Sequence, residues 1–462
     1  MVGGSGDRLW PLSRKKYPKQ FNKLISKNSL FQETALRFKK NKIIDFDDPI
    51  ILTNNEYRFI INEQLKEIKV TPKLIILEPL KKNTSPAILA ASLFEKNSKN
   101  LLLLVPSDHY IENKNLFLDD LAYALKKFKN DYLSIFGIKP DRVETGYGYI
   151  KILDNEKSRL KTFESFIEKP DNKNAKIFYK KGNYLWNSGL ILFDPIFLIS
   201  LFGKYDKITL DNTEKAILYG EKDLNFFRLN EKNWNKCKNI SIDYAILEKI
   251  KSIKVIMANF IWDDLGDWQS VWKNKSKHGL VKIGNIVDFN SENSLFYSLS
   301  NDQVLATIGV DNVIVVSMDD AVLVVNKNQT QKVKEVVKKL KLKKYKQAED
   351  HNTDYRPWGT FKNLISEENF KVKKISVAPG ESLSLQKHKY RSENWVIVEG
   401  KAKITLNKKI IYKNVGEAIY IPKGAIHRLE NDTKNKLVII EVQTGEYFGE
   451  DDIIRLEDKY SR

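Results

Sequence analysis

The segment from residue 3 to residue 21, GGSGDRLWPLSRKKYPKQF, combines a glycine-rich loop with two early cations. Glycines let backbone N–H groups approach phosphate oxygens closely, and cations neutralise the charge of a phosphoanhydride that is made or broken. The glycine spacing does not match the G-x-G-x-x-G fingerprint of dinucleotide folds, and an ordinary turn is the alternative. We predict a polyphosphate site that contains Gly3, Gly4, Ser5, Gly6, Arg8 and Lys19.

Two aspartates are candidates for holding the metal ion that such phosphates need. Asp108 stands in the sequence PSDH after an apolar run, and Asp264 stands in WDDLGDW. Mg²⁺ prefers oxygen ligands and commonly bridges carboxylates to phosphates. Either aspartate by itself would be an ordinary turn residue. Their assignment as magnesium ligands therefore depends on the family resemblance described below.

A second group of residues has the spacing of a metal site. The sequence contains G-x5-Q-x-H-x4-E-x6-G from Gly380 and G-x5-P-x-G-x2-H-x3-N from Gly416, which resemble the two halves of the cupin pattern. Alternate residues of a strand point to one face, so such side chains can converge inside a barrel. A mixed oxygen and nitrogen ligand set suits Zn²⁺, and also Mn²⁺, Fe²⁺ or Co²⁺. The predicted ligands are Gln386, His388, Glu393 and His427.

The first 260 residues read as an α/β domain. Short apolar runs alternate with helical stretches from residue 29 to about residue 260. Ser29 with Gln32 predicts a capping box for a helix through Phe38, and Ser85–Pro86 opens another helix. Buried strands are predicted at residues 74–77, 101–105 and 133–137.

The remainder of the chain is richer in β-formers. Residues 280–326 predict short strands, with a hairpin turn at Asp319–Asp320. A one-sided helix that packs on these strands is predicted from Val333, Val336, Val337 and Leu340. Residues 343–355 read as a linker and residues 356–462 as a small barrel. We therefore predict three domains, at residues 1–265, 266–345 and 346–462.

Composition narrows the classes of protein that fit. The 78 Lys and Arg residues and 59 Asp and Glu residues give a net charge of +19. Nucleic-acid binding is one interpretation of this charge, but the lysines are scattered and no nucleic-acid module appears, so we expect no nucleic-acid partner. No apolar run is long enough to span a membrane, and no secretory signal precedes the glycine loop. With Cys237 as the single cysteine, the sequence favours a cytoplasmic protein without membrane partners.

Further motifs carry a resemblance along the whole chain. They are EPLKKNTSP at 78–86, FGIKPDRVETGYGYI at 136–150, FIEKP at 166–170, WNSG at 186–189 and SIDYAILEK at 241–249. With the glycine loop, they resemble sugar-1-phosphate nucleotidyltransferases of the mannose-1-phosphate guanylyltransferase type. The barrel sequence, with RPWG at 356–359, resembles the mannose-6-phosphate isomerase domain of the bifunctional members of that family.

The resemblance implies a fold and a set of residue roles. The expected fold is α/β, with a Rossmann-like domain on a mixed, mostly parallel sheet, a β-rich middle segment and a C-terminal cupin barrel. Arg8 and Lys19 are expected to be catalytic, and Asn83 to contact the nucleotide. Asp108 and Asp264 would bind Mg²⁺. The residues expected around the sugar phosphate are Gly146, Glu168 and Asn187 at the sugar and Lys169 at the phosphate.

Several positions depart from the family pattern. Asp7 stands where Thr is usual and puts a carboxylate near the phosphates, and Lys82 replaces a common Arg. Only Met1 and Val2 precede the glycine loop, where the family has an apolar strand, so we expect a misassigned start or an incomplete chain.

The expected function is bifunctional. One site would join mannose 1-phosphate and GTP to give GDP-mannose and pyrophosphate, with Mg²⁺. The barrel would interconvert mannose 6-phosphate and fructose 6-phosphate, with Arg391 stabilising an enediolate or holding the phosphate and with no general base identified. One alternative is a guanylyltransferase with a structural or metal-sensing barrel, and another is an isomerase with a defunct transferase. Oligomeric state stays open, with a homo-oligomer possible.

Overall fold

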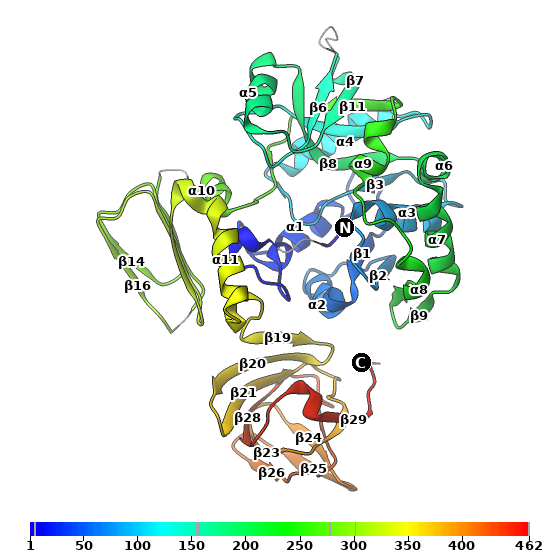
Figure 1. The fold of residues 1–462 in the computed structure, drawn as a ribbon. Helices are drawn as coiled ribbons and strands as arrows, with labels where there is room; N and C mark the ends of the chain where they lie inside the picture. Colours follow the sequence, from blue (N-terminus) through cyan, green and yellow to red (C-terminus); the bar gives the residue numbers. More distant parts are fainter. Residues whose placement is uncertain (4–5, 154–157, 277–278, 301, 461–462) are drawn as a thin grey trace. The chain divides into compact units, whose positions relative to one another are not determined.

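The computed structural model describes residues 1–3, 6–153, 158–276, 279–300 and 302–460 (Figure 1). Two members of the predicted phosphate loop, Gly4 and Ser5, lie outside the described residues. The chain divides into two compact units, residues 1–348 and residues 349–462. No helix in the described part of the chain combines the length and the apolar character needed to cross a bilayer.

Two sheets form the centre of the α/β region. The smaller sheet has, in order, β1 (Ile50–Asn54), β2 (Leu74–Glu78), β10 (Phe226–Arg228) and β9 (Glu221–Asp223). The larger sheet has, in order, β3 (Leu102–Leu104), β8 (Tyr184–Phe193), β5 (Leu133–Ile138), β11 (Ile253–Met257), β7 (Leu160–Ile167) and β6 (Tyr149–Ile152). The expected mixed α/β fold is confirmed.

Strand direction differs from the expectation of a mostly parallel sheet. Strands β1, β2 and β10 pair in parallel, as do β5 and β11. The other described neighbours in these two sheets are antiparallel. Strand β6 pairs with both β7 and β8, and β7 follows β6 after a short connection, which permits only an antiparallel pair.

Helices cover both faces of the larger sheet. In β8, Leu190 and Leu192 pack with α4 (Lys114–Lys127), whereas Ile191 and Phe193 pack with α3 (Thr84–Glu95) and α6 (Pro195–Tyr205), because successive strand residues point to opposite faces. The helices of this region are α1 (Leu30–Arg37), α2 (Arg58–Glu67), α3 (Thr84–Glu95), α4 (Lys114–Lys127), α5 (Asn172–Lys181), α6 (Pro195–Tyr205), α7 (Lys207–Leu218), α8 (Glu231–Trp234), α9 (Ile242–Ala245) and α10 (Trp268–Lys275). The predicted capping box of α1 is present at Ser29.

A groove separates the two sheets between their edge strands β1 and β3. Val2 forms a parallel bridge with Thr53 of β1, and the Met1 amine donates a hydrogen bond to the Val105 carbonyl at 2.8 Å. The rest of the groove has a volume of about 430 Å³ and is lined by apolar side chains from both edges. Strand β3 is therefore half-buried rather than buried as predicted.

The β-rich middle segment is a stack of parallel strands. Strands β13 (Val281–Ile283), β15 (Leu295–Ser298) and β17 (Val313–Ser317) pair in parallel, as do β14 (Ile286–Phe289) and β16 (Leu305–Ile308). Strand β18 (Val322–Asn326) returns antiparallel to β17, so the hairpin predicted at Asp319–Asp320 is confirmed. This segment belongs to the same compact unit as the α/β region.

Helix α11 (Val333–Leu342) joins the stack to the glycine loop. Val333 and Val337 are buried in one core with strand residues of the stack and with Leu9 and Trp10, which follow the loop. Val336 was predicted to share this face, but its side chain is 42% exposed. The β-rich segment thus helps to hold the glycine loop in place.

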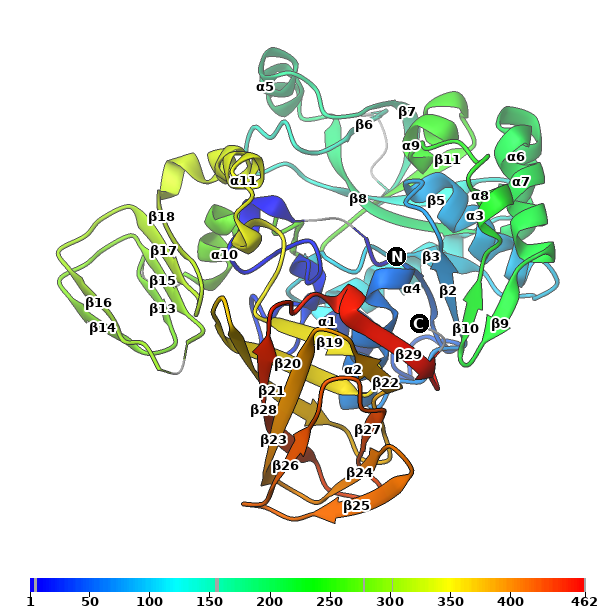
Figure 2. The same ribbon diagram turned by 60° about the horizontal axis from the view of Figure 1, so that its bottom comes forward.

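The second unit is a barrel of two facing sheets (Figure 2). One sheet has, in order, β19 (Thr353–Arg356), β20 (Gly359–Ser366), β21 (Phe370–Val377), β28 (Leu437–Gly445), β23 (Arg391–Glu399) and β26 (Ala418–Ile421). The other has β25 (Lys409–Lys413), β24 (Ala402–Leu406), β27 (His427–Glu430), β22 (Leu385–His388) and β29 (Ile453–Glu457). The predicted cupin barrel is confirmed.

A buried ion pair links the N-terminal segment to the β-stack and gives a stability prediction. Both terminal nitrogens of Arg14 donate to the Asp320 carboxylate at 2.6 Å, and the Arg14 side chain is fully buried. Asp320→Ala removes the carboxylate that both terminal nitrogens of the buried guanidinium bind, which costs about 3 kcal/mol. We expect thermal unfolding of the chain to shift down by about 5 °C or more.

The matched control is Lys273→Ala. Lys273 pairs with Asp141 at 2.6 Å, but both side chains are about half exposed. An exposed pair contributes about 1 kcal/mol at most, so this variant should shift unfolding by only ~2 °C. Equal shifts for the two variants would contradict the role given to the buried pair.

Candidate active sites

A two-stranded ribbon brings the predicted magnesium ligands together. Strand β4 (Tyr110–Ile111) pairs antiparallel with β12 (Trp262–Asp263), with Tyr110 opposite Asp263. Asp108 lies just before the first strand and Asp264 just after the second. The antiparallel register therefore places both carboxylates at the same end of the ribbon.

Lys19 occupies the space between the two aspartates. Its ammonium lies 3.0 Å from Asp108 Oδ2 and donates to the Asp264 carbonyl at 2.6 Å. Burial alone would lower the pKa of Lys19, but the charges of Asp108 and Asp264 outweigh it and raise that pKa. Burial likewise favours a higher pKa for Asp108, yet Lys19 and His109 hold it below its ordinary value. The site thus holds a buried, charged lysine beside a charged carboxylate that is half-buried.

Two neighbours of this cluster were not predicted as site residues. The Tyr147 hydroxyl donates to Asp264 Oδ1 at 2.8 Å, and Trp262 donates to His109 Nδ1 at 3.2 Å. Burial lowers the pKa of His109, although Asp108 opposes the shift. Tyr147 stands in the GYGYI motif and His109 in PSDH. Their positions next to the predicted residues Gly146 and Asp108 could have indicated them.

The remaining phosphate-loop residues are only partly assembled around the cluster. Gly6 has a φ of +61°, and a Cβ there would lie 2.6 Å from Ser13 Oγ and 3.0 Å from Lys19 Cβ, so this glycine lets the loop pack on Lys19. Arg8, in contrast, donates to Gln331 Oε1 at 2.7 Å, although its charge is near enough to act on Lys19. Asp7, placed by the sequence near phosphates, faces Lys341 at 4.0 Å.

The EPLKKNTSP motif forms a turn and a helix start. Asn83 has a φ of +65°, and its side chain accepts a hydrogen bond from the Thr84 N–H at 2.9 Å, capping α3. Lys82 donates to the Asn235 carbonyl at 2.7 Å. A nucleotide contact by Asn83 therefore stays a prediction, and its visible role is to begin the helix.

The predicted sugar residues meet around the start of β6. Tyr149 pairs with Ile167 and with Trp186, so Glu168 and Asn187 both lie beside Gly148. A Cβ on Gly148 would lie 2.6 Å from the buried Phe166 ring and 2.7 Å from Glu168 Oε2, which explains the glycine. Glu168 pairs with Lys169 at 2.5 Å, and Gly146 donates to Glu144 at 2.9 Å. The structure thus gathers Glu168, Lys169 and Asn187 and places Gly146 on the adjoining loop.

The predicted barrel ligands also converge. His388 of β22, Glu393 of β23 and His427 of β27 offer ligand atoms that all lie within 4.8 Å of one another, and all three residues are buried. Glu393 Oε1 lies 3.1 Å from His388 Nε2, and Glu393 Oε2 lies 3.7 Å from His427 Nε2. Burial would raise the pKa of Glu393, but the hydrogen bond from His388 and nearby positive charge hold it well below the ordinary value.

The orientation of these side chains fits a metal ion. His427 Nδ1 lies 3.0 Å from the Ala425 carbonyl, which leaves Nε2 as the lone-pair atom. That Nε2 atom is buried and has no hydrogen-bond partner among the described residues. Gln386 Oε1 accepts from Ser384 at 2.8 Å, and a half-turn of its amide would direct the oxygen to the centre instead. Two imidazoles, a carboxylate and an amide oxygen form a donor set for a divalent transition metal.

A polar network surrounds the triad. Arg391 donates to Glu393 Oε1 at 3.3 Å and to Asp452 Oδ2 at 3.4 Å, and is nearly fully buried. Trp395 donates to both Glu393 and Glu441. Burial and the charge of Glu393 raise the pKa of Glu441 to about 8. The sequence analysis did not single out Glu441, which lies on β28 outside both halves of the cupin pattern.

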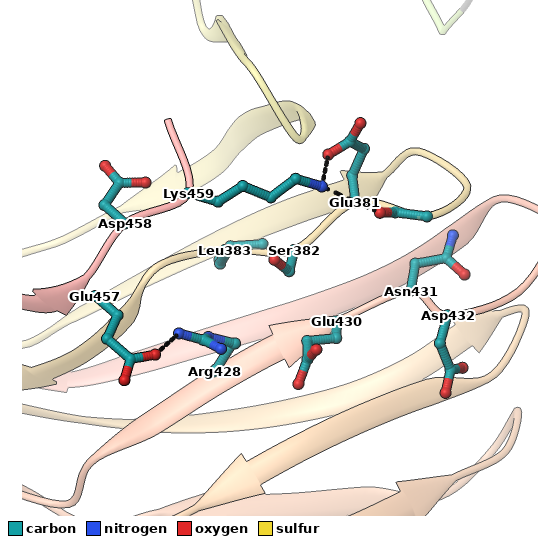
Figure 3. A pocket seen from close by; sticks show the side chains of 11 residues that line it. Glu381, Ser382, Leu383, Arg428, Glu430, Asn431, Asp432, Glu457, Asp458 and Lys459 are labelled. Atoms are coloured by element: carbon teal, nitrogen blue, oxygen red, sulfur yellow. Dashed lines mark hydrogen bonds and ion pairs between the residues drawn. The ribbon is translucent and has the colours of Figure 1, made fainter. Parts of the chain in front are cut away.

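A separate cavity lies on the barrel away from the triad (Figure 3). It has a volume of about 540 Å³, and its lining includes none of the predicted metal ligands. Its charged side chains pair across it, Lys459 with Glu381 at 2.9 Å and Arg428 with Glu457 at 2.6 Å. We therefore place the barrel chemistry at the triad rather than in this cavity.

Comparison with known proteins covers the whole chain. Residues 1–279 match the nucleotidyl transferase family, residues 284–340 the mannose-phosphate isomerase and guanylyltransferase-like β-helix domain, and residues 343–458 the mannose-6-phosphate isomerase C-terminal domain. A solved structure of a mannose-1-phosphate geranyltransferase from Thermus thermophilus superposes with a TM-score of 0.64 at 29% identity, covering 73% of this chain and 97% of that one.

Full-length relatives agree with these matches. Mannose-1-phosphate guanylyltransferase 2 of Escherichia coli O157:H7 is 39% identical over 100% of this chain and 97% of its own length. Alginate biosynthesis protein AlgA of Pseudomonas syringae pv. tomato is 37% identical over 100% of this chain and 96% of its own length. The chain therefore belongs to the nucleotidyl transferase family and, over its whole length, to the mannose-1-phosphate guanylyltransferases within it.

Proposed function

We propose that residues 1–348 transfer a guanylyl group from GTP to mannose 1-phosphate, giving GDP-mannose and pyrophosphate. The observation that carries this proposal is the buried cluster in which Lys19 lies 3.0 Å from Asp108 and donates to Asp264. Of the predicted sugar residues, Glu168 follows β7 and Asn187 lies within β8, and these two strands flank β6. We infer guanine as the base and mannose as the sugar from the full-length guanylyltransferase relatives.

The reaction needs position and positive charge more than a general base. An oxygen of the sugar phosphate, already an anion, attacks the α-phosphorus of GTP, and the bond to the β-phosphate oxygen breaks. Lys19 supplies a fixed positive charge that burial keeps from being screened by water. Mg²⁺, which Asp108 and Asp264 would hold, supplies further charge at the phosphates. Tyr147 restrains the Asp264 carboxylate through its hydrogen bond.

Transfer is tested by pyrophosphate release with Mg²⁺, mannose 1-phosphate and each nucleoside triphosphate in turn. We expect selective turnover with GTP, and a loss of about a hundredfold or more in kcat for Asp108→Asn and Asp264→Asn, because each loses a charged oxygen ligand. Asp171→Asn, a change at a helix cap outside the cluster, is the control and should keep kcat within about twofold. A purified chain that releases no pyrophosphate would contradict the proposal and favour a defunct transferase.

We also propose that the barrel interconverts mannose 6-phosphate and fructose 6-phosphate with a bound divalent metal. The match of residues 343–458 to the isomerase domain supports this activity. A cavity beside Gln386 and Glu393 has four cations in its lining, Arg356, Lys373, Arg391 and Arg455, together with the carboxylates Glu441 and Glu450. Its volume of about 50 Å³ is smaller than a sugar phosphate, so we assign no substrate to the cavity itself. Arg391, which contacts Glu393, is the cation that we propose for the enediolate. A metal ion would polarise the substrate oxygens during the proton shift between C1 and C2.

The isomerase proposal predicts that the two activities separate. Glu393→Gln removes the charged ligand, so metal content after dialysis and isomerase rate should both fall at least about tenfold, while guanylyl transfer stays within about twofold. Glu457→Gln, which changes an exposed pair in the outer cavity, is the matched control and should keep both. A metal-free wild-type barrel without isomerase activity would instead support a guanylyltransferase with a structural barrel.

A further inference from the structure

A second carboxylate lies next to the predicted sugar residues. Asp243 is the second residue of the short helix α9, and its Oδ1 accepts a hydrogen bond from Asn187 Nδ2 at 3.1 Å. It stands in the SIDYAILEK motif, to which the sequence analysis assigned no residue role.

Charged neighbours define the surroundings of Asp243. Burial and the negative charge of Glu168 raise the pKa of Asp243 to about 6, and the positive charge of Lys169 partly opposes the shift. Glu168 Oε1 is itself paired with the Lys169 ammonium at 2.5 Å. Two carboxylates and one ammonium therefore lie near enough to one another to interact electrostatically.

Asn187 is already committed by its own hydrogen bonds. Its Oδ1 accepts from the Gly189 N–H at 3.1 Å, its Nδ2 donates to Asp243, and its backbone N–H donates to the Gly148 carbonyl at 2.8 Å. The amide is thus held in one orientation. Acceptor capacity for a ligand comes chiefly from the two carboxylates, which have more lone pairs than these contacts use.

This arrangement matches a sugar phosphate in a definite orientation. Two carboxylates repel a phosphate, so they must face the neutral, hydroxyl-bearing part of the ligand, while Lys169 faces the phosphate. Ionised carboxylates only accept hydrogen bonds, and each sugar hydroxyl has one proton to donate. Two neighbouring acceptors can therefore bind two hydroxyls of one ring and discriminate between epimers.

We propose that Asp243 accepts a hydrogen bond from a ring hydroxyl of the sugar 1-phosphate and, with Glu168, determines which sugar the transferase accepts. This assignment rests on the proposed guanylyltransferase function. It makes Asp243 a binding and specificity residue rather than a part of the helix start alone.

The test compares the full-length wild-type chain with Asp243→Asn, which keeps the shape but loses the charge. We expect the Kd for mannose 1-phosphate, measured by calorimetry, to rise about tenfold or more, and the Kd for GTP to stay within about twofold. Asp194→Asn is the matched control, because Asp194 caps α6 away from the pocket and Asn can replace it. Thermal unfolding of each variant checks that the fold is retained.

Mannose 1-phosphates that lack one hydroxyl distinguish direct contact from an effect through Asn187. We expect that one deoxy analogue binds the wild type as weakly as mannose 1-phosphate binds Asp243→Asn. Asp243→Asn should bind that analogue with no further loss of affinity. The assignment would be overturned by an equal additional loss of affinity for every analogue, by an unchanged Kd of Asp243→Asn for mannose 1-phosphate, or by a parallel rise in its Kd for GTP. Sugar binding without turnover would contradict the proposed transfer but leave the role of Asp243 intact.

Discussion

The placement of one buried ammonium is the constraint on which the transferase site depends. Lys19 lies between Asp108 and Asp264, which are far apart in the sequence and are joined through the β4–β12 ribbon. A buried charge without partners would be costly, so the lysine, the two aspartates and the ribbon stabilise one another. The glycine loop can pack over this cluster because Gly6 has no side chain.

Other parts of the first unit support that cluster. The β-stack and α11 share a core with Leu9 and Trp10, and the Arg14–Asp320 ion pair fixes the segment between the loop and Lys19. The β-rich segment is thus a structural support of the active-site loop as well as a connection to the barrel. The barrel also contains a buried charge that is stabilised by its neighbours, since Glu393 is buried among His388, His427 and Arg391.

Much of both sites could be predicted from sequence because short motifs fix local geometry. Gln386 and His388 lie on one strand and Glu393 on the next, so their convergence follows from the alternation of side chains along strands. The capping box at Ser29 involves residues of a single helical turn. The two residues that the motifs assigned to the sugar, Glu168 and Asn187, also lie close together, because both stand opposite Gly148 in the strand register. In each case the residues that carry the signal lie within one element or beside its end.

Long-range pairing could not be read in the same way. The antiparallel neighbours in the larger sheet, the parallel stacking of β13, β15 and β17, and the contact of Arg8 with Gln331 join segments that no local pattern connects. Val336 has the same spacing as the buried valines of α11, yet it is exposed because the strands cover only part of the helix face. Asp243 and Glu441 were missed because their importance depends on neighbours from other elements.

We propose two independent metal-using sites, one in each unit, and the number of bound Mn²⁺ ions tests this proposal most directly. Electron paramagnetic resonance titration with GTP present should show two Mn²⁺ ions per wild-type chain. One should disappear in Asp108→Asn and the other in His427→Ala, each without loss of the remaining ion. Retention of both ions in Asp108→Asn, or loss of both from a single substitution, would contradict the account.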